Sequence, residues 1–218
     1  MNSLKLVALL LLVLTGCELS AADPATSNTA AQKRGRIVIL GDSITAGYGL
    51  AKGDAYPALI QKKIEEAGLL YKVENAGLSG DTTAGALRRI DWLLQRPIHV
   101  LVIELGGNDG LRGLPSGVTE ANLQSIIDKV KARSPLTRIM IAGMRIPPNL
   151  GADYTGEFEQ VFSDLATKNG AVLVPFLLEG VGGNRGLNQP DQIHPTAAGQ
   201  KIIAETVWKR LQPLLQTK

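Results

Sequence analysis

The chain has 218 residues, of which 44% are hydrophobic, and a formal net charge of +3. This length suggests a single domain, and the apolar content is enough for a full hydrophobic core. With so small a charge and no run of basic residues, the sequence gives little support for nucleic-acid binding.

The first 16 residues differ in character from the rest. A short, weakly positive start precedes nine uninterrupted apolar residues, 6–14. Such a run is too short to span a bilayer but is typical of a secretory signal, so residues 1–16 are predicted to be a signal peptide. The residues Leu14-Thr15-Gly16-Cys17 resemble the lipobox of bacterial lipoproteins. This resemblance implies cleavage before Cys17 and lipidation of this residue, the only cysteine in the chain.

Two interpretations of this start remain open. A plain secretory signal cut after Ala21 or Ala22 would discard Cys17 and leave a soluble periplasmic protein. A lipoprotein would instead be anchored at the periplasmic face of a bacterial membrane. Glu18 favours the outer membrane, because an aspartate at this position would resemble an inner-membrane retention signal. Residues 17–34 are rich in Ala, Ser, Thr and Asn without periodicity, which predicts a flexible tether to a folded domain at 35–218.

Apolar strands alternate with amphipathic helices along the rest of the chain. We expect strands at 36–41, 71–75, 99–105, 138–143 and 171–175, and helices at 54–67, 83–96, 119–132, 154–169 and 195–211. Asp54 is expected to cap the first helix and Pro195 to be the first residue of the last. Single helices between strands demand right-handed crossovers and a parallel sheet. The predicted fold is a three-layer α/β/α sandwich with a five-stranded parallel sheet, flavodoxin-like, in the order 2-1-3-4-5.

Polar loops follow several of these strands and are expected to converge at one edge of the sheet. Ser43 directly follows the first strand and offers a hydroxyl as a nucleophile. His194 is the candidate base, and Asp191, three residues earlier, can orient its ring. The alternative is that Asp191 is a turn residue and His194 merely starts a helix. His99, the other histidine, opens a strand at the opposite edge and is predicted to be structural.

Three N–H donors are candidates for an oxyanion hole, the group that stabilises negative charge on a carbonyl oxygen. Gly80 can approach a ligand closely because it lacks a side chain, Asn108 carries an amide with two N–H donors, and the Ser43 N–H is the third. Gly80 could equally be a plain turn glycine, and Asn108 the residue of an Asx-turn.

These blocks, 41–43, 80, 106–109 and 191–194, resemble those of the SGNH hydrolases, also called the GDSL family. Residues 36–215 are similar to its thioesterase I, arylesterase and lysophospholipase branch throughout. The resemblance implies that Ser43 is the nucleophile, His194 the base and Asp191 its orienter, with Ser43, Gly80 and Asn108 in the oxyanion hole. Gly77 stands where close relatives have a larger residue, so either Gly77 or Gly80 is the donor; we favour Gly80 because it precedes Asp81-Thr82.

The resemblance implies hydrolysis of aryl esters, lysophospholipids and acyl-CoA thioesters through an acyl-enzyme. Export makes esters or lysophospholipids the more plausible substrates, because acyl-CoA is scarce outside the cytoplasm. Four apolar residues in two loops are expected either to line an acyl groove or only to cover the sheet edge: Leu111, Leu114, Ile146 and Pro147.

The alternatives are a carbohydrate O-deacetylase of the same fold and a non-catalytic lipoprotein. The sequence has no Gly-x-Ser-x-Gly elbow, no Walker-type phosphate loop and no cluster of metal-ligand residues. We therefore expect no cofactor and no metal. Separately, we expect a monomer.

Overall fold

The structure is a computed structural model that describes residues 35–216. The predicted signal peptide, the lipobox with Cys17 and most of the tether lie outside the described residues. Within residues 35–216, no helix is both long enough and apolar enough to cross a membrane.

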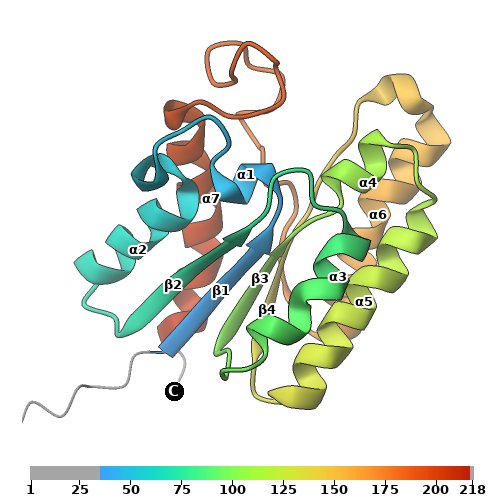
Figure 1. Ribbon diagram of the computed structural model, residues 1–218. Helices are drawn as coiled ribbons and strands as arrows, with labels where there is room; N and C mark the ends of the chain where they lie inside the picture. Colours follow the sequence, from blue (N-terminus) through green and yellow to red (C-terminus); the bar gives the residue numbers. More distant parts are fainter. Residues whose placement is uncertain (1–34, 217–218) are drawn as a thin grey trace, which may run out of the picture. The chain divides into compact units, whose positions relative to one another are not determined.

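A five-stranded parallel sheet forms the centre of the domain (Figure 1). Its strands are β1 (Gly35–Gly41), β2 (Tyr71–Gly77), β3 (Val100–Glu104), β4 (Arg138–Ala142) and β5 (Val172–Val174). Every pairing is parallel, and the order is β2-β1-β3-β4-β5. The predicted strand order is confirmed.

The two central strands are buried on both faces. Residues 37–40 of β1 and 100–102 of β3 are fully buried, and Ile39 lies opposite Val102 in the register. β-branched residues suit such a strand because they pack well against both neighbouring layers. The buried run ends at Gly41 and brings Ser43 to the carboxyl edge of the sheet.

Helices cover both faces of the sheet. Figure 1 shows α2 (Tyr56–Glu66) and α7 (Ala197–Gln216) on one face, and α3 (Thr83–Leu93), α5 (Ser116–Arg133) and α6 (Ala152–Asn169) on the other. Thr82 caps α3, its side chain accepting the Gly85 N–H. The predicted three-layer sandwich is confirmed.

Four short elements were not predicted, and all lie in loops that follow strands β1, β3 and β4. They are α1 (Ser43–Ala46), η1 (Lys52–Asp54), α4 (Gly107–Leu111) and η2 (Pro148–Leu150). Two of them, α1 and α4, contain the candidate site residues Ser43 and Asn108 in their first turns.

Two predicted helix starts were wrong. Asp54 ends the 3-10 turn η1, and α2 begins after Ala55 without a side-chain cap, while the Tyr56 N–H donates to Gln200 Oε1 at 2.8 Å. Pro195 forms an isolated bridge with Asn188, so α7 begins only at Ala197. At α2 the contact comes from Gln200 of α7, whereas at α7 it comes from Asn188, seven residues before Pro195.

Candidate active site

The structure joins Ser43, His194 and Asp191 in a chain of hydrogen bonds. His194 Nε2 lies 3.0 Å from Ser43 Oγ, and His194 Nδ1 lies 2.7 Å from Asp191 Oδ2. The ring of Tyr48 packs against the imidazole, with 4.5 Å between the ring centroids. This is the geometry in which an imidazole can take a proton from a serine hydroxyl while a carboxylate fixes its tautomer.

Asp191 is held by the turn that carries His194. Its Oδ1 accepts the N–H groups of Ile193 and His194 at 2.9 and 3.0 Å. Gln192, between Asp191 and Ile193, has a φ of +59°, which is uncommon for a residue other than glycine. These N–H donors and the His194 side chain lower the pKa of Asp191 to about 2. Asp191 is therefore ionised throughout the neutral range and can stabilise an imidazolium.

Ser43 is the first residue of the short helix α1. Asp42 caps this helix, its Oδ1 accepting the Ile44 N–H at 2.9 Å. Within residues 35–216, no acceptor binds the Ser43 N–H, as expected for the first residue of a helix. The cap and the turn together present the hydroxyl and the free N–H of Ser43 at the same edge.

The two glycines that compete as oxyanion donors have different surroundings. The Gly77 N–H donates to Asn75 Oδ1 at 2.9 Å, and a Cβ on Gly77 would lie 2.3 Å from the Ala46 nitrogen. Gly80 has a φ of +78°, open space around its Cβ position and no acceptor for its N–H in the described part of the chain. This arrangement supports Gly80 as the donor and gives Gly77 a packing role under α1.

The Asn108 amide already uses both of its N–H groups. Nδ2 donates to the Asp81 carbonyl oxygen at 2.9 Å and to Asp42 Oδ2 at 3.1 Å. To serve an oxyanion, it must exchange one of these partners for the substrate oxygen. The bond to Asp42 is the longer of the two and is the one we expect to be exchanged.

A buried carboxyl group supports the turn that carries Ser43. Glu104, at the end of β3, is fully buried, and its Oε2 accepts the Thr45 hydroxyl at 2.6 Å and the Asp42 N–H at 3.3 Å. Tyr56 OH lies 2.7 Å from the same Thr45 oxygen. Burial, with Asp42 nearby, raises the pKa of Glu104 well above its usual range. Burial likewise raises the pKa of Asp42 to about 6.

A cavity of about 260 Å³ adjoins Ser43, His194 and Asn108. Of the predicted acyl-groove residues, Leu111 and Pro147 line it. Ile146 is buried beneath the loop and Leu114 lies outside the lining. Other apolar side chains that line it are Met144, Leu178 and Ile193. An acyl-binding role for Leu111 and Pro147 stays a prediction.

His99 lies away from these residues. Its Nδ1 accepts the Arg36 N–H at 2.9 Å, at the amino ends of β1 and β3. Within residues 35–216, no group of three or more His, Cys, Asp or Glu side chains is placed to hold a metal ion.

Sequence reasoning missed three supports of the site: Glu104, Thr45 and Gln189. Gln189 links the histidine loop to the serine loop, its Nε2 donating to the carbonyl oxygens of Tyr48 at 2.7 Å and Pro195 at 3.0 Å. A signal existed only for Glu104, a lone carboxylate closing an otherwise apolar strand. The other two depend on contacts that only the folded chain creates.

The domain is a three-layer α/β/α sandwich, and a hydrogen-bonded serine, histidine and aspartate lie at the carboxyl edge of its sheet. This combination is that of a serine hydrolase. The GDSL-like lipase/acylhydrolase family matches residues 39–202, and the chain belongs to this family. The resemblance drawn from the four sequence blocks is thereby confirmed.

Known relatives match almost the whole chain. It is 43% identical over 206 residues to the esterase TesA of Pseudomonas aeruginosa, covering 94% of this chain and 98% of that protein. It is 40% identical over 181 residues to thioesterase 1/protease 1/lysophospholipase L1 of Escherichia coli, covering 82% and 84%. A crystal structure of TesA matches with a TM-score of 0.79 and 42% identity, over 83% of this chain and 99% of that chain.

Proposed function

We propose that this protein hydrolyses carboxylic esters and thioesters through an acyl-enzyme on Ser43. The observation that carries the proposal is the continuous hydrogen-bond chain from Asp191 through His194 to Ser43, at the mouth of an apolar cavity. Family membership and relatives named as esterase and thioesterase support the same chemistry.

The first step forms the acyl-enzyme. Ser43 Oγ attacks the carbonyl carbon as His194 Nε2 takes the hydroxyl proton, and Asp191 stabilises the resulting imidazolium. The carbonyl oxygen becomes an oxyanion that accepts the N–H groups of Ser43 and Gly80 and, after the Asp42 bond is exchanged, the Asn108 amide. The carbonyl then re-forms as the C–O or C–S bond breaks, and the imidazolium gives its proton to the leaving alcohol or thiol.

The second step regenerates the free enzyme. Water attacks the acyl carbon while His194 takes a proton from the water, and the same N–H donors stabilise the second oxyanion. When this intermediate collapses, the bond to Ser43 Oγ breaks and Oγ regains the proton from the imidazolium. The products are a carboxylic acid and free enzyme.

The substrates we propose are aryl esters, lysophospholipids and acyl thioesters. The name of the Escherichia coli relative includes both thioesterase and lysophospholipase. The apolar side chains beside Ser43 suit an acyl chain longer than acetyl. This favours the proposal over a carbohydrate O-deacetylase.

We also propose that the protein is exported and anchored by lipid at Cys17, as its lipobox-like sequence suggests. Mass spectrometry of the mature protein tests this: a lipid-modified Cys17 at the amino terminus is expected. A free amino terminus beyond residue 17 would contradict the anchor.

Hydrolysis rates on a panel of p-nitrophenyl esters, a lysophospholipid and an acyl-CoA test the activity. We expect turnover of butyryl and longer esters that the Ser43→Ala variant loses by about 10⁴-fold or more. Release of acetyl groups from acetylated glycans, without activity on longer chains, would point to the deacetylase. Unchanged turnover in Ser43→Ala would contradict the proposed nucleophile.

A further inference from the structure

The ring of Tyr48 stacks on the imidazole of His194. The ring centroids are 4.5 Å apart and the ring planes are inclined by 39°, so the two rings form a tilted stack. Tyr71 meets His99 differently, edge to face, with 6.4 Å between the centroids and 85° between the planes. The histidine of the candidate active site is therefore stacked on an aromatic ring, and the structural histidine is not.

Both nitrogen atoms of His194 are already engaged. Nδ1 lies 2.7 Å from Asp191 Oδ2, and Nε2 lies 3.0 Å from Ser43 Oγ. Only the faces of the imidazole remain for a further contact. The face of an aromatic ring carries partial negative charge and attracts a cation within about 6 Å of the ring centroid. Tyr48 therefore lies where it can stabilise the positive charge that His194 acquires when it takes the Ser43 proton.

Water limits what Asp191 alone can contribute. The Asp191 side chain is 38% exposed, so its charge is partly screened by solvent. The His194 side chain is only 19% exposed, although Gln192 and Ile193 beside it are exposed. The Tyr48 ring covers part of the imidazole, and the attraction between an imidazolium and a carboxylate strengthens where water is removed.

The backbone of Tyr48 is bonded to both loops of the site. Its N–H donates to the Ser43 carbonyl oxygen at 3.0 Å, and its own carbonyl oxygen accepts Gln189 Nε2 at 2.7 Å. Gln189 in turn donates its backbone N–H to the His194 carbonyl oxygen at 2.7 Å. Tyr48 is thus tied directly to the nucleophile and, through Gln189, to the base.

Glycines on both sides of Tyr48 permit this path of the chain. Gly47 and Gly49 each have a φ of +74°, in the region that favours glycine. A Cβ on Gly49 would lie 2.5 Å from Gln189 Oε1. A Cβ on Gly47 would lie 2.6 Å from the Ala55 Cβ. The Gly-Tyr-Gly sequence therefore lets the two loops approach closely enough for the rings to stack.

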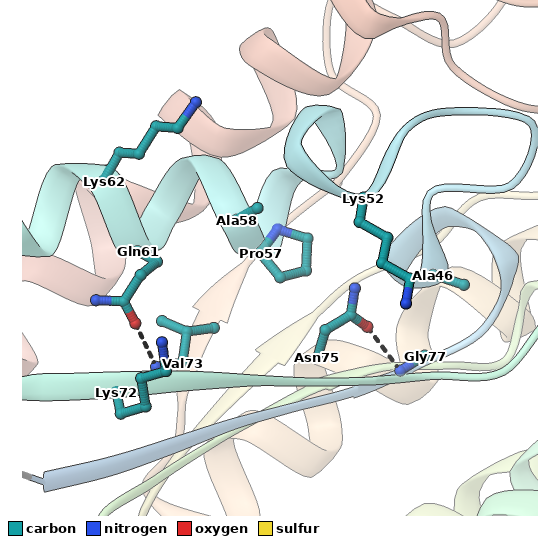
Figure 2. A pocket seen from close by; sticks show the side chains of 10 residues that line it. All are labelled: Ala46, Lys52, Pro57, Ala58, Gln61, Lys62, Lys72, Val73, Asn75 and Gly77. Carbon is teal, nitrogen blue, oxygen red and sulfur yellow. Dashed lines mark hydrogen bonds between the residues drawn. The ribbon is translucent and has the colours of Figure 1, made fainter.

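The chain reaches Tyr48 from a fixed point, the end of α1. Asn75 Nδ2 donates to the Thr45 carbonyl oxygen at 2.9 Å. Figure 2 shows Asn75 and Gly77 beside Ala46, the last residue of α1, with Asn75 Oδ1 accepting the Gly77 N–H. Tyr48 follows two residues later, so its position is set from β2 as well as from the loop that carries His194.

The hydroxyl group of Tyr48 has no part in this arrangement. Tyr48 is 52% exposed, and among residues 35–216 its hydroxyl forms no hydrogen bond. A contribution of Tyr48 to the site must therefore come from its ring.

We propose that Tyr48 is a positioning residue that acts through His194. Its ring holds the imidazole in line with Ser43 Oγ and stabilises the imidazolium in both steps of the reaction. The inference rests on the proposed function and adds a residue to its machinery. A contact between a cation and an aromatic face contributes about three- to thirtyfold to the rate.

Hydrolysis of p-nitrophenyl butyrate by ring variants tests this role. Tyr48→Leu should lower kcat about three- to thirtyfold at nearly unchanged KM, because the imidazolium forms in both steps. Tyr48→Phe keeps the ring and should retain the wild-type kcat. Trp92→Leu, which removes a 68% exposed aromatic side chain from α3, is the control and should retain it as well.

Three kinetic outcomes would overturn the proposal. They are an equal kcat in the wild type and Tyr48→Leu, an equal loss in Tyr48→Leu and Tyr48→Phe, and a rise in KM at unchanged kcat. Tyr48→Gln is a second variant without the ring, for use if Tyr48→Leu does not fold, and we expect the same loss from it.

Proton NMR of the histidine rings reports on the contact without any substrate. Because the chain has only two histidines, their ring C–H signals can be assigned with His194→Ala. Tyr48→Leu should move the signals of His194 and leave those of His99 in place, whereas Tyr48→Phe should keep both near their wild-type positions. Signals of His194 that do not respond to loss of the ring would contradict the stacking role.

Labelling by a fluorophosphonate separates this inference from the proposed function. The reagent reacts once with Ser43 and needs no ester turnover. Slower labelling of Tyr48→Leu than of a wild type that hydrolyses no ester would contradict the proposed function alone. Equal ester hydrolysis and equal labelling in the wild type and Tyr48→Leu would contradict the role of Tyr48 alone.

Discussion

The two halves of the candidate site are built in opposite ways. The serine turn, residues 41–46, is anchored in the core: Asp42 is 3% exposed, Thr45 is fully buried, and both bond to the buried Glu104. The histidine loop, residues 189–194, is exposed or half-buried and is held by hydrogen bonds within its own turn and by the Gln189 side chain, which donates to the Tyr48 carbonyl oxygen. The nucleophile therefore depends on the core of the sheet, and the base depends on a local turn.

This contrast predicts that the two halves respond differently to substitution. Changes in the serine turn should alter both stability and activity, because its polar groups are buried with few alternatives. Changes in the histidine loop should alter activity strongly and lower the free energy of unfolding less than changes in the serine turn do, because surface loops contribute little to it.

The largest expected effect is that of His194→Ala. Loss of the base should lower kcat/KM by about 10⁴-fold, and the free energy of unfolding should change by less than about 0.5 kcal/mol. Ester hydrolysis and urea denaturation of the same preparation measure the two quantities. A variant that loses activity only because it unfolds would contradict the independence of the histidine loop.

Asn108→Ala should have the next largest effect. Removing one oxyanion donor lowers kcat by about 10²- to 10³-fold. KM should change little, because the donor acts on charge that develops in the transition state. Asn149→Ala, at an exposed asparagine in η2, is the control and should retain wild-type kcat. A large rise in KM at unchanged kcat would assign Asn108 to substrate binding.

Substitution of Gly77 tests the coupling of the serine turn to the core. A Cβ there would meet the Ala46 nitrogen at 2.3 Å and displace α1, so Gly77→Ala should lower the free energy of unfolding by about 1–3 kcal/mol and also lower kcat. In Gly80→Ala the new Cβ would lie in open space and the N–H is retained. Only the positive φ is unfavourable, and it should lower the free energy of unfolding by about 1 kcal/mol. A larger loss of stability at Gly80 than at Gly77 would reverse our assignment of the two glycines.

The smallest effect is the pH dependence of stability, and it has opposite signs in the two halves. The pKa of Asp42 is raised from 3.8 to about 6, so its contribution to stability is present below pH 3.8 and lost as pH rises toward 6. The pKa of Asp191 is lowered to about 2, so its contribution is present above pH 3.8 and lost as pH falls toward 2.

Urea denaturation across pH 2 to 7 measures both contributions. Relative to the wild type, Asp42→Asn should gain stability as pH rises from about 4 to 6. Asp191→Asn should lose relative stability as pH rises from about 2 to 4. Parallel curves for the two variants would contradict the difference between the buried and the exposed carboxylate.

The strands, their order and the converging loops could be predicted because each depends on local patterns. Residues 37–40 and 100–103 read as buried strands from composition alone, and parallel strands place their carboxyl ends together. The turn from Asp191 to His194 is also local, so its spacing was informative. The same reasoning found Ser43, Gly80 and Asn108 as a set.

The supports of the serine turn could not be predicted because they join distant segments. Glu104 at the end of β3 accepts the hydroxyl of Thr45 in α1, and Gln200 of α7 accepts the Tyr56 N–H. At α7 the contact is nearer in sequence, since Pro195 bridges Asn188, seven residues earlier. A helix-start rule reads only neighbouring residues, so it misplaced the starts of α2 and α7.

Covalent labelling of Ser43 tests the central claim most directly. The wild-type protein is treated with a fluorophosphonate, and the modified peptide is identified by mass spectrometry. We predict one adduct per chain on Ser43, slow labelling in His194→Ala and none in Ser43→Ala. A folded wild-type protein that remains unlabelled, or that carries its adduct on another residue, would contradict the account of Ser43 as the nucleophile.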